Sequence, residues 1–268
     1  MVDSKMFASL PAEVALVMSA YLRLVDARLP GRVSGLYLVG SLALDDYRSG
    51  QSDIDFVTVT DLAFTPSELT QLRQIHRELR RTRKSPTLDG VYVTWSELRA
   101  EPNGRAAPYC LDGKFFPSGG FAANPVTWFT ILRHPVPMRG PANPAIWHDD
   151  ESLRRWCREN LQSYWAAWVY KARNRFVQRL YSCLHQAVVW GVLGVTRLHA
   201  TIKTGEIISK TAAGNYALEA FPAQWSAIVE DALGGRLGSP AVSRRGVFER
   251  RRDALAFMEY VISDCASL

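Results

Sequence analysis

The chain has 268 residues, of which 47% are hydrophobic and 22% charged, with a formal net charge of +6 and a pI near 9.2. This composition is typical of a globular protein with one large or two ordinary domains, and it excludes an extensively disordered chain. The positive charge favours an anionic partner, but charge alone does not choose among a nucleic acid, a membrane surface and a polyphosphate.

The cysteines and the apolar segments indicate the cellular compartment. The four cysteines are widely spaced without a Cys-x-x-Cys pair, so we expect free thiols in a reducing compartment rather than a zinc site. Glu13 interrupts the apolar stretch near the N-terminus, and no signal peptide with a cleavage site follows. The longest later apolar run, residues 187–195, is about half as long as a membrane-spanning helix. The sequence therefore predicts a cytoplasmic protein without a membrane partner.

The first half alternates between helical and strand patterns. Apolar residues at helical spacing predict helices, and short runs of apolar or β-branched residues predict strands. Ser67 is expected to cap the second helix. In chain order, the sequence predicts a helix over 11–28, strands over 37–39 and 54–60, a helix over 67–83, a strand over 88–95, a loop-rich segment over 101–120 and renewed apolar structure over 127–132.

The second half changes character after a proline-rich stretch over 135–144. This stretch is the predicted domain boundary, which gives domains of 1–144 and 145–268. No strand-like alternation follows it, so the second domain is predicted to be a helical bundle. Its expected helices cover 149–170, 174–204, 209–218, 221–233 and 245–266.

The stretch from Gly40 to Asp55 holds the main candidate site. One apolar run ends at Gly40-Ser41, and a second begins with Asp53 and Asp55, which point to the same face of a strand. Two carboxylates on one face favour a hard divalent cation with oxygen ligands. An isolated Asp-x-Asp is more often an ordinary strand start, but the Gly-Ser pair and a third acid favour a metal site.

Small residues in the same stretch are candidates for phosphate binding. Gly40 allows close approach of the backbone, and Ser41 supplies a hydroxyl and amides suited to phosphate oxygens. The alternative for this pair is an ordinary turn. Ser52 is either a further phosphate donor or a cap of the following strand.

Asp89, at the start of the predicted third strand, is the candidate third acid. In a two-metal phosphoryl-type transfer, a third carboxylate can take the proton from the attacking hydroxyl. Glu97 is the competing acid, but it follows the strand in a helix start. The order strand, Gly-Ser, Asp-x-Asp strand, helix, acid-bearing strand favours Asp89. Trp95, at the end of that third strand, is a candidate for stacking on a substrate ring.

The arrangement of Gly40-Ser41, Ser52-Asp53-Ile54-Asp55 and Asp89 resembles the nucleotidyltransferase superfamily that includes DNA polymerase beta and the antibiotic adenylyltransferases. The segment 197–218, with Thr204-Gly205-Glu206-Ile207-Ile208-Ser209-Lys210, resembles the C-terminal helical domain of streptomycin/spectinomycin adenylyltransferases. The resemblance implies an α/β (α+β) polymerase-beta-like nucleotidyltransferase domain followed by an all-α helical bundle domain that completes the substrate cleft.

The resemblance also implies an activity. It is the transfer of AMP from ATP, with two magnesium ions, to a hydroxyl of an aminoglycoside or aminocyclitol, which gives antibiotic resistance. By carry-over, Asp53 and Asp55 bind magnesium, and Asp89 is the catalytic base and a third metal ligand. The residues that are expected to meet the triphosphate are Gly40, Ser41 and Ser52.

The matching helical segment adds candidates and one departure. Lys210 has a phosphate or interdomain role, or is merely a lysine near a helix start. Thr211 and Asn215 are candidate substrate-binding residues, at positions where streptomycin modifiers carry an acid or a related polar group. Loss of an acid where a cationic drug binds argues against streptomycin. Asp89 is also one methylene shorter than the glutamate of those enzymes.

Two other functions stay open on the sequence. One is a nucleotidyltransferase that acts on RNA or protein, and the other is a catalytically inert nucleotide-binding module. No RNA-binding module is recognisable, and the basic run 77–84 has no interleaved aromatic residues, which argues against a nucleic acid. The acid trio argues against the inert module, although a fold does not guarantee a function. The sequence does not choose between a monomer and a dimer.

Overall fold

The computed structural model describes residues 9–82, 85–102, 104, 106–119, 123–239 and 246–267. The chain divides into two compact units, Met1–His148 and Asp149–Leu268. Ile146, which follows the proline-rich stretch, is buried in a core of the first unit, so this unit continues beyond residue 144. In the described part of the chain, no helix has the length and apolarity needed to cross a membrane.

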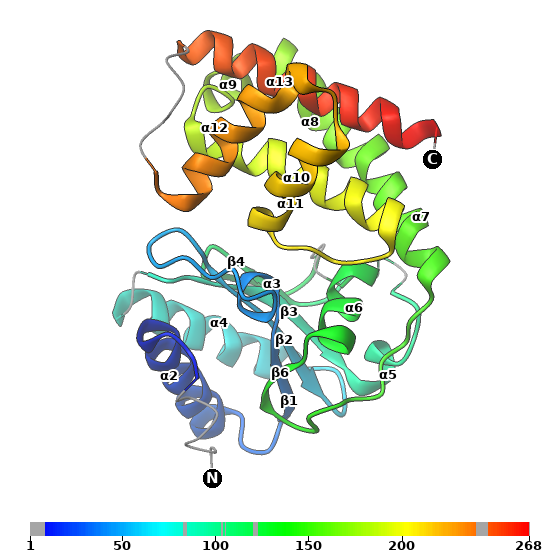
Figure 1. Ribbon diagram of the computed structural model, residues 1–268. Helices are drawn as coiled ribbons and strands as arrows, with labels where there is room; N and C mark the ends of the chain where they lie inside the picture. The colour runs from blue at the N-terminus through cyan, green and yellow to red at the C-terminus, as the bar shows by residue number, and fades with distance from the viewer. Residues whose placement is uncertain are drawn as a thin grey trace. The chain divides into compact units, whose positions relative to one another are not determined.

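The first unit is built on a six-stranded mixed sheet with the strand order β5-β4-β3-β2-β1-β6 (Figure 1). Only the central pair, β2 and β3, is parallel among the strand pairs that are described, and the others are antiparallel. The strands are β1 (Val33–Leu38), β2 (Ile54–Thr60), β3 (Leu88–Thr94), β4 (Tyr109–Leu111), β5 (Lys114–Phe116) and β6 (Val136–Arg139).

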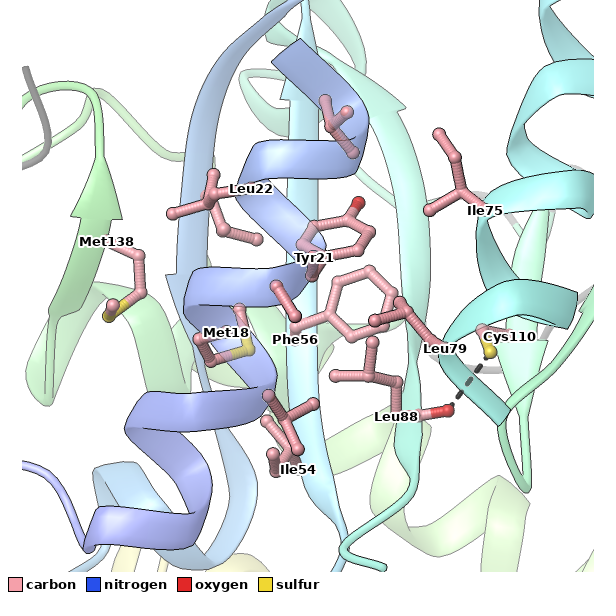
Figure 2. Packing of buried hydrophobic residues seen from close by; sticks show 14 of the residues in the cluster. Met18, Tyr21, Leu22, Ile54, Phe56, Ile75, Leu79, Leu88, Cys110 and Met138 are labelled. Carbon is pink, nitrogen blue, oxygen red and sulfur yellow. Dashed lines mark hydrogen bonds between the residues drawn. The ribbon is translucent and has the colours of Figure 1, made fainter. Parts of the chain in front are cut away.

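The sheet separates two apolar cores. Helices α2 and α4 cover one face, and Figure 2 shows Tyr21 and Leu22 of α2 and Leu79 of α4 against Ile54 and Phe56 of β2. Helices α5 and α6 supply part of the core on the other face. The helices of this unit are α2 (Ala12–Arg28), α3 (Gly40–Ala43), α4 (Pro66–Thr82), α5 (Trp95–Leu98) and α6 (Pro125–Arg133).

Three strands lie where the sequence predicted loops or a linker. Strands β4 and β5 form a hairpin within the segment 101–120, and β6 lies within the proline-rich stretch. Each has only three or four residues, which is too short for a clear alternation pattern. Pro137 is tolerated in β6 because this strand is at the edge of the sheet.

The start of α4 also differs from the prediction. Thr65, rather than Ser67, caps this helix, because its hydroxyl accepts the Glu68 N–H at 3.3 Å and the Glu68 carboxylate accepts the Thr65 N–H at 2.8 Å. This reciprocal pair is a capping box, and it places the cap two residues earlier than predicted and the first residue of α4 at Pro66. The basic run that ends α4 is described only to Thr82, so Arg83 and Lys84 lie outside the described residues.

The second unit is helical throughout its described part, as predicted (Figure 1). Two of the predicted helices are divided. The first contains a π-helical turn, η1, and the second is interrupted where the Ser182 hydroxyl and the Cys183 thiol donate to the Arg179 carbonyl. The elements are α7 (Asp150–Asn160), η1 (Leu161–Trp165), α8 (Ala166–Asn174), α9 (Phe176–Tyr181), α10 (His185–Thr204), α11 (Lys210–Ala220), η2 (Ala223–Trp225), α12 (Ser226–Leu237), α13 (Val247–Asp264) and η3 (Cys265–Ser267).

Candidate functional site

The parallel pairing of β2 and β3 brings the acids together. Asp55 and Asp89 are direct register partners across this pair, so their side chains lie next to each other on one face of the sheet. Ile54 and Phe56 belong to the core under α2 and α4, so by alternation Asp55 faces the opposite side. Asp53 lies two residues before Asp55, and the same alternation predicts the same face for it.

The environment of Asp89 favours its protonated form. Burial, followed by the negative charges of Asp53 and Asp55, raises the pKa of Asp89 from 3.8 to about 7. The backbone N–H of Asp112 donates to Asp89 Oδ1 at 2.7 Å and opposes part of this shift. A carboxyl group with this pKa exchanges protons near neutral pH, as a general base must.

The β4–β5 hairpin holds the strand end that carries Asp89. Asp112 and Gly113 at its tip both have positive φ, 50° and 69°, which is typical of a type I′ turn. The Gly113 N–H donates to the Leu88 carbonyl at 3.0 Å, and the Cys110 thiol donates to the same oxygen at 3.0 Å (Figure 2). The tip therefore contacts Leu88 through its backbone and orients the Asp89 carboxylate through the Asp112 N–H.

Sequence reasoning did not assign a role to this hairpin tip. The available signal was the Asp112-Gly113 dipeptide between two short apolar runs, a strong indicator of a hairpin. The many prolines and glycines of the surrounding segment favoured a loop and concealed this signal.

Gly40 lies directly against the acids. Its φ is +60°, and a Cβ atom at this position would be 1.9 Å from Asp55 Oδ2. Both the backbone conformation and the lack of space therefore require glycine. Next to it, Ser41 Oγ is buried and has no hydrogen-bond partner among the described residues. A buried hydroxyl without a partner is costly, and a bound phosphate oxygen would satisfy it.

Ser52 and Arg48 lie on the turn that leads into β2. Ser52 Oγ accepts the Arg48 N–H at 3.0 Å, and the Ser52 N–H donates to the Arg48 carbonyl at 2.8 Å, so Ser52 closes this turn. The Arg48 guanidinium is 3.6 Å from Asp46 Oδ1, but its buried Nε makes no hydrogen bond within the described part of the chain. Sequence reasoning treated Arg48 only as a turn residue, and its cationic group is a further phosphate-binding candidate.

The donor set around Asp55 consists of oxygen atoms, which fits a hard cation. In the part of the chain that the structure describes, no group of three His, Cys, Asp or Glu side chains is arranged to hold a metal ion. Mg²⁺ is usually bound by one or two carboxylates together with water and substrate phosphates, so a protein cage of three side chains is not required.

The structure does not bring Trp95 to the acids. Trp95 follows β3 and Asp89 is at its start, and six residues of strand span about 20 Å. The Trp95 indole N–H donates to Ser34 Oγ at 2.8 Å, and its ring leaves no room for a Cβ on Gly35. Trp95 therefore packs against β1 and is not placed for substrate stacking at the acids. The sequence pattern predicted strand β3, but it did not show that Trp95 and Asp89 lie at opposite ends of this strand.

The remaining candidates lie in the helical unit on α11. Lys210 is the first residue of this helix, and Ser209 caps it by accepting the Ala212 N–H at 3.2 Å. A cation at a helix N-terminus is unfavourable for the helix dipole, and an anion bound there would offset this cost. Thr211 and Asn215 are four residues apart, so they lie on one face of α11.

Comparisons with known proteins agree with this arrangement of domains. Residues 19–86 match the model of the nucleotidyltransferase domain family, a range that contains Gly40, Ser41, Asp53 and Asp55 and ends before Asp89. Residues 162–263 match the model of the aminoglycoside adenylyltransferase C-terminal domain. No curated protein matches the chain in sequence.

A solved structure supports the same fold. The crystal structure of the spectinomycin adenyltransferase AAD(9) from Enterococcus faecialis with ATP and spectinomycin has a TM-score of 0.62 to this chain. The two sequences are 14% identical, and the match covers 91% of this chain and 98% of that one. At this identity the likeness concerns the fold.

The strand order, the acids on β2 and β3 and the matched domains indicate the class. Residues 19–86 match the nucleotidyltransferase domain family, and residues 162–263 match the C-terminal domain of the aminoglycoside adenylyltransferases. The chain therefore resembles the aminoglycoside adenylyltransferases, and it has the predicted fold of a nucleotidyltransferase domain followed by a helical domain.

Proposed function

We propose that this protein transfers AMP from ATP to a hydroxyl group of an aminoglycoside or aminocyclitol antibiotic. The observation that carries the proposal is the pairing of Asp55 with Asp89, with Gly40 against Asp55 and the Ser41 hydroxyl unsatisfied beside it. These groups provide a base, a cation site and a phosphate contact within one unit. The family of the C-terminal domain supports the antibiotic as the acceptor.

The proposed reaction is one displacement at the α-phosphorus of ATP. Asp89 takes the proton of the acceptor hydroxyl, and the acceptor oxygen forms a bond to the α-phosphorus. The bond from this phosphorus to its bridging oxygen breaks, and pyrophosphate leaves with the electron pair. The products are the O-adenylylated acceptor, pyrophosphate and the proton, which Asp89 releases to water.

Asp53 and Asp55 are the proposed magnesium ligands, with Asp89 as a further ligand. The oxygen-only donor set fits Mg²⁺, and the triphosphate would complete its coordination. The bound ions would neutralise negative charge on the phosphates and on the leaving oxygen. They would also offset the repulsion among the acids, which adds to burial in raising the pKa of Asp89.

The triphosphate contacts come from small or cationic residues. We assign the Ser41 hydroxyl and the space left by Gly40 to phosphate oxygens, supported by the unsatisfied Oγ and the close approach to Asp55. Ser52 supports this loop by closing its turn. Lys210 is the proposed phosphate ligand of the helical unit, supported by its place at the start of α11.

The proposed acceptor site lies on α11. Thr211 and Asn215 are the proposed acceptor-binding residues, and neither carries a negative charge. A site that lacks a carboxylate at these positions gives a cationic drug one charge-assisted contact fewer. We therefore rank spectinomycin-type aminocyclitols above streptomycin. ATP as the donor is consistent with a cytoplasmic location.

The test is incubation of the purified protein with α-labelled ATP, Mg²⁺ and separate acceptors: spectinomycin, streptomycin, other aminoglycosides and transfer RNA. We expect label on an antibiotic, stoichiometric pyrophosphate, and no transfer by Asp53→Asn. Label on transfer RNA alone would assign the protein to the RNA-modifying alternative. ATP binding without pyrophosphate release for any acceptor would assign it to the inert module.

A further inference from the structure

Helix α9 of the helical unit presents its apolar side chains to solvent. It carries Phe176, Val177, Leu180 and Tyr181, yet none of its residues is buried. The exposed fractions of Phe176 and Val177 are 76% and 70%. Amphipathic helices are normally stabilised by burying their apolar face, so α9 lacks a partner for that face within the described chain.

The exposed apolar surface extends beyond α9 itself. Burial, followed by the neighbouring Tyr181, raises the pKa of Tyr164, so Tyr164 of η1 lies near Tyr181 of α9. The Arg251 guanidinium of α13 donates to Ser182 Oγ at 2.8 Å, so the end of α9 is anchored to the bundle (Figure 1). We define the α9 surface as the apolar side chains of this region that are at least 50% exposed: Tyr164, Tyr170, Phe176, Val177, Leu180, Tyr181 and Leu184.

The charged residues in the sequence segment that forms this surface are all cations. Lys171, Arg173, Arg175 and Arg179 lie among its apolar residues, and the sequence has no Asp or Glu from residue 160 to 205. Arg173 pairs with Glu259 at 2.6 Å, whereas the other three cations make no ion pair with any described residue. The α9 surface is therefore apolar and cationic, and a complementary partner must be apolar and anionic.

The charge pattern discriminates among possible partners. A symmetric contact with a second copy would place these cations opposite each other, and the neighbouring acid Glu259 is already paired with Arg173. A nucleic acid supplies phosphates and stacking bases, but it leaves the aliphatic Val177, Leu180 and Leu184 without a counterpart. An anionic lipid surface supplies both phosphates for the cations and an acyl region for the aliphatic and aromatic side chains.

We propose that the α9 surface attaches the protein reversibly to an anionic lipid surface. The contact is peripheral, since no described helix can cross a membrane. It is independent of AMP transfer, because none of the groups that we assign to the reaction lies between residues 160 and 205. The sequence pattern did not indicate this contact. The cations and apolar residues are interleaved within a segment that was predicted to be one continuous helix of the bundle.

The test uses the full chain in sedimentation with vesicles of phosphatidylcholine, with and without phosphatidylglycerol. We expect binding to the anionic vesicles only, and weaker binding at high salt. Arg175→Gln with Arg179→Gln should lower the partition coefficient about 25-fold, since each cation near the surface contributes roughly a factor of five. Phe176→Ser with Leu180→Ser should lower it by about tenfold or more.

Matched controls separate the α9 surface from general effects. Leu62→Ser removes an apolar side chain that is 71% exposed in the other unit, and Arg23→Gln removes an exposed cation there; neither should change binding. Circular dichroism checks that each variant is folded. Equal binding to neutral vesicles, or equal losses in the control variants, overturns the proposal. A wild-type dimer in sedimentation velocity that Phe176→Ser with Leu180→Ser dissociates would also overturn it, and would assign the surface to a second copy.

Discussion

The environment of Asp89 disfavours its charged form and therefore lowers the stability of the folded protein near neutral pH. An unfolded chain ionises this carboxyl near 3.8, whereas the folded protein keeps it protonated up to about pH 7. Between these values the unfolded state binds fewer protons, so the contribution of Asp89 becomes increasingly unfavourable as the pH rises and is constant above about pH 7.

Asp89→Asn should therefore inactivate the protein and stabilise it. The amide keeps an oxygen that accepts the Asp112 N–H but cannot ionise. We expect AMP transfer to fall at least about 100-fold, because the base is lost. We also expect the free energy of unfolding to rise by on the order of 2 kcal/mol at about pH 8, after allowance for solvent screening, and by almost nothing at about pH 4. Urea denaturation at the two pH values measures this, and equal gains at both would contradict the raised pKa.

Substitution of Gly40 tests the proposed phosphate contact at the same site. Gly40→Ala places a methyl group against Asp55 Oδ2 in a backbone conformation that alanine rarely adopts. We expect a loss of stability of about 2 kcal/mol or more and at least about 100-fold slower transfer. Gly50→Ala is the matched control, because Gly50 also has positive φ, +75°, but a Cβ atom there would have no neighbour within 4 Å. Similar transfer rates for the two variants would show that closeness to Asp55 is not needed.

At this scale the sequence predicted that Asp55 and Asp89 lie on two strands, because alternation and the order of elements indicate both, and the structure makes these strands neighbours. It did not specify the register that pairs Asp55 with Asp89, since this register depends on how α4, which connects the two strands, packs on the face of the sheet. Arg48 and Asp112 were missed because their contributions, a buried Nε and a backbone N–H, depend on loop conformation. Trp95 was misplaced because a stacking residue has no signature beyond its residue type.

Elements on the α4 side of the sheet are joined by a buried chain of hydrogen bonds. The Leu88 carbonyl can only accept, so the Cys110 thiol donates to it, and the Cys110 sulfur accepts from His76 Nδ1 at 3.2 Å. His76 Nε2 is then unprotonated and accepts the Tyr92 hydroxyl at 2.5 Å, and Tyr92 accepts from Tyr21 at 3.0 Å. In order of donation, the chain runs from Thr58 through Tyr21, Tyr92, His76 and Cys110 to Leu88.

This chain requires neutral His76, which gives a prediction for acid stability. Burial lowers the pKa of His76 from 6.5 to about 3, so stability present above pH 6.5 is lost as the pH falls towards 3. The loss should be about 2 kcal/mol between pH 7.5 and pH 5. Protonation of Asp89 stabilises the folded wild type over the same pH range. The pH dependence of the wild type alone therefore does not reveal the loss that is due to His76. At pH 7.5, His76→Gln should have a lower free energy of unfolding than the wild type. At pH 5 this difference between the variant and the wild type should be smaller. Urea denaturation at both pH values measures it. A constant deficit would contradict the neutral histidine.

Elements with a long periodic pattern were predicted from the sequence, and short ones were not. Helix α4 and strand β2 were predicted because an apolar stripe or a continuous β-branched run marks them. Strands β4, β5 and β6 are stabilised by pairing with β3, β4 and β1, respectively. The local sequence pattern of each strand does not show these pairings. The breaks around α9 arise from side-chain hydrogen bonds to helix carbonyls, which propensity does not encode.

At the scale of the whole molecule, the change from strand alternation to helical periodicity predicted two differently built halves. The proline-rich stretch marked the change, but Ile146 continues the first core beyond it, which a compositional boundary cannot detect. The net charge of +6 was equally visible in the sequence, but its role depends on where the acids lie. The field next to Asp89 is negative, because Asp53 and Asp55 lie beside it, whereas the net charge of the whole chain acts at longer range.

This charge distribution predicts opposite salt effects for the two substrates. The net charge of +6 should attract the anionic magnesium–ATP complex and slow the encounter with a cationic acceptor. Raising the ionic strength shortens the Debye length from about 30 Å at 0.01 M to about 8 Å at 0.15 M, which removes both effects. We therefore expect kcat/KM for ATP to fall severalfold, roughly 3- to 10-fold, while kcat/KM for the acceptor rises or stays constant. Steady-state kinetics at constant free Mg²⁺ measure both. A fall of equal size for both substrates would show that salt acts on the chemical step or on the fold instead of on the encounter.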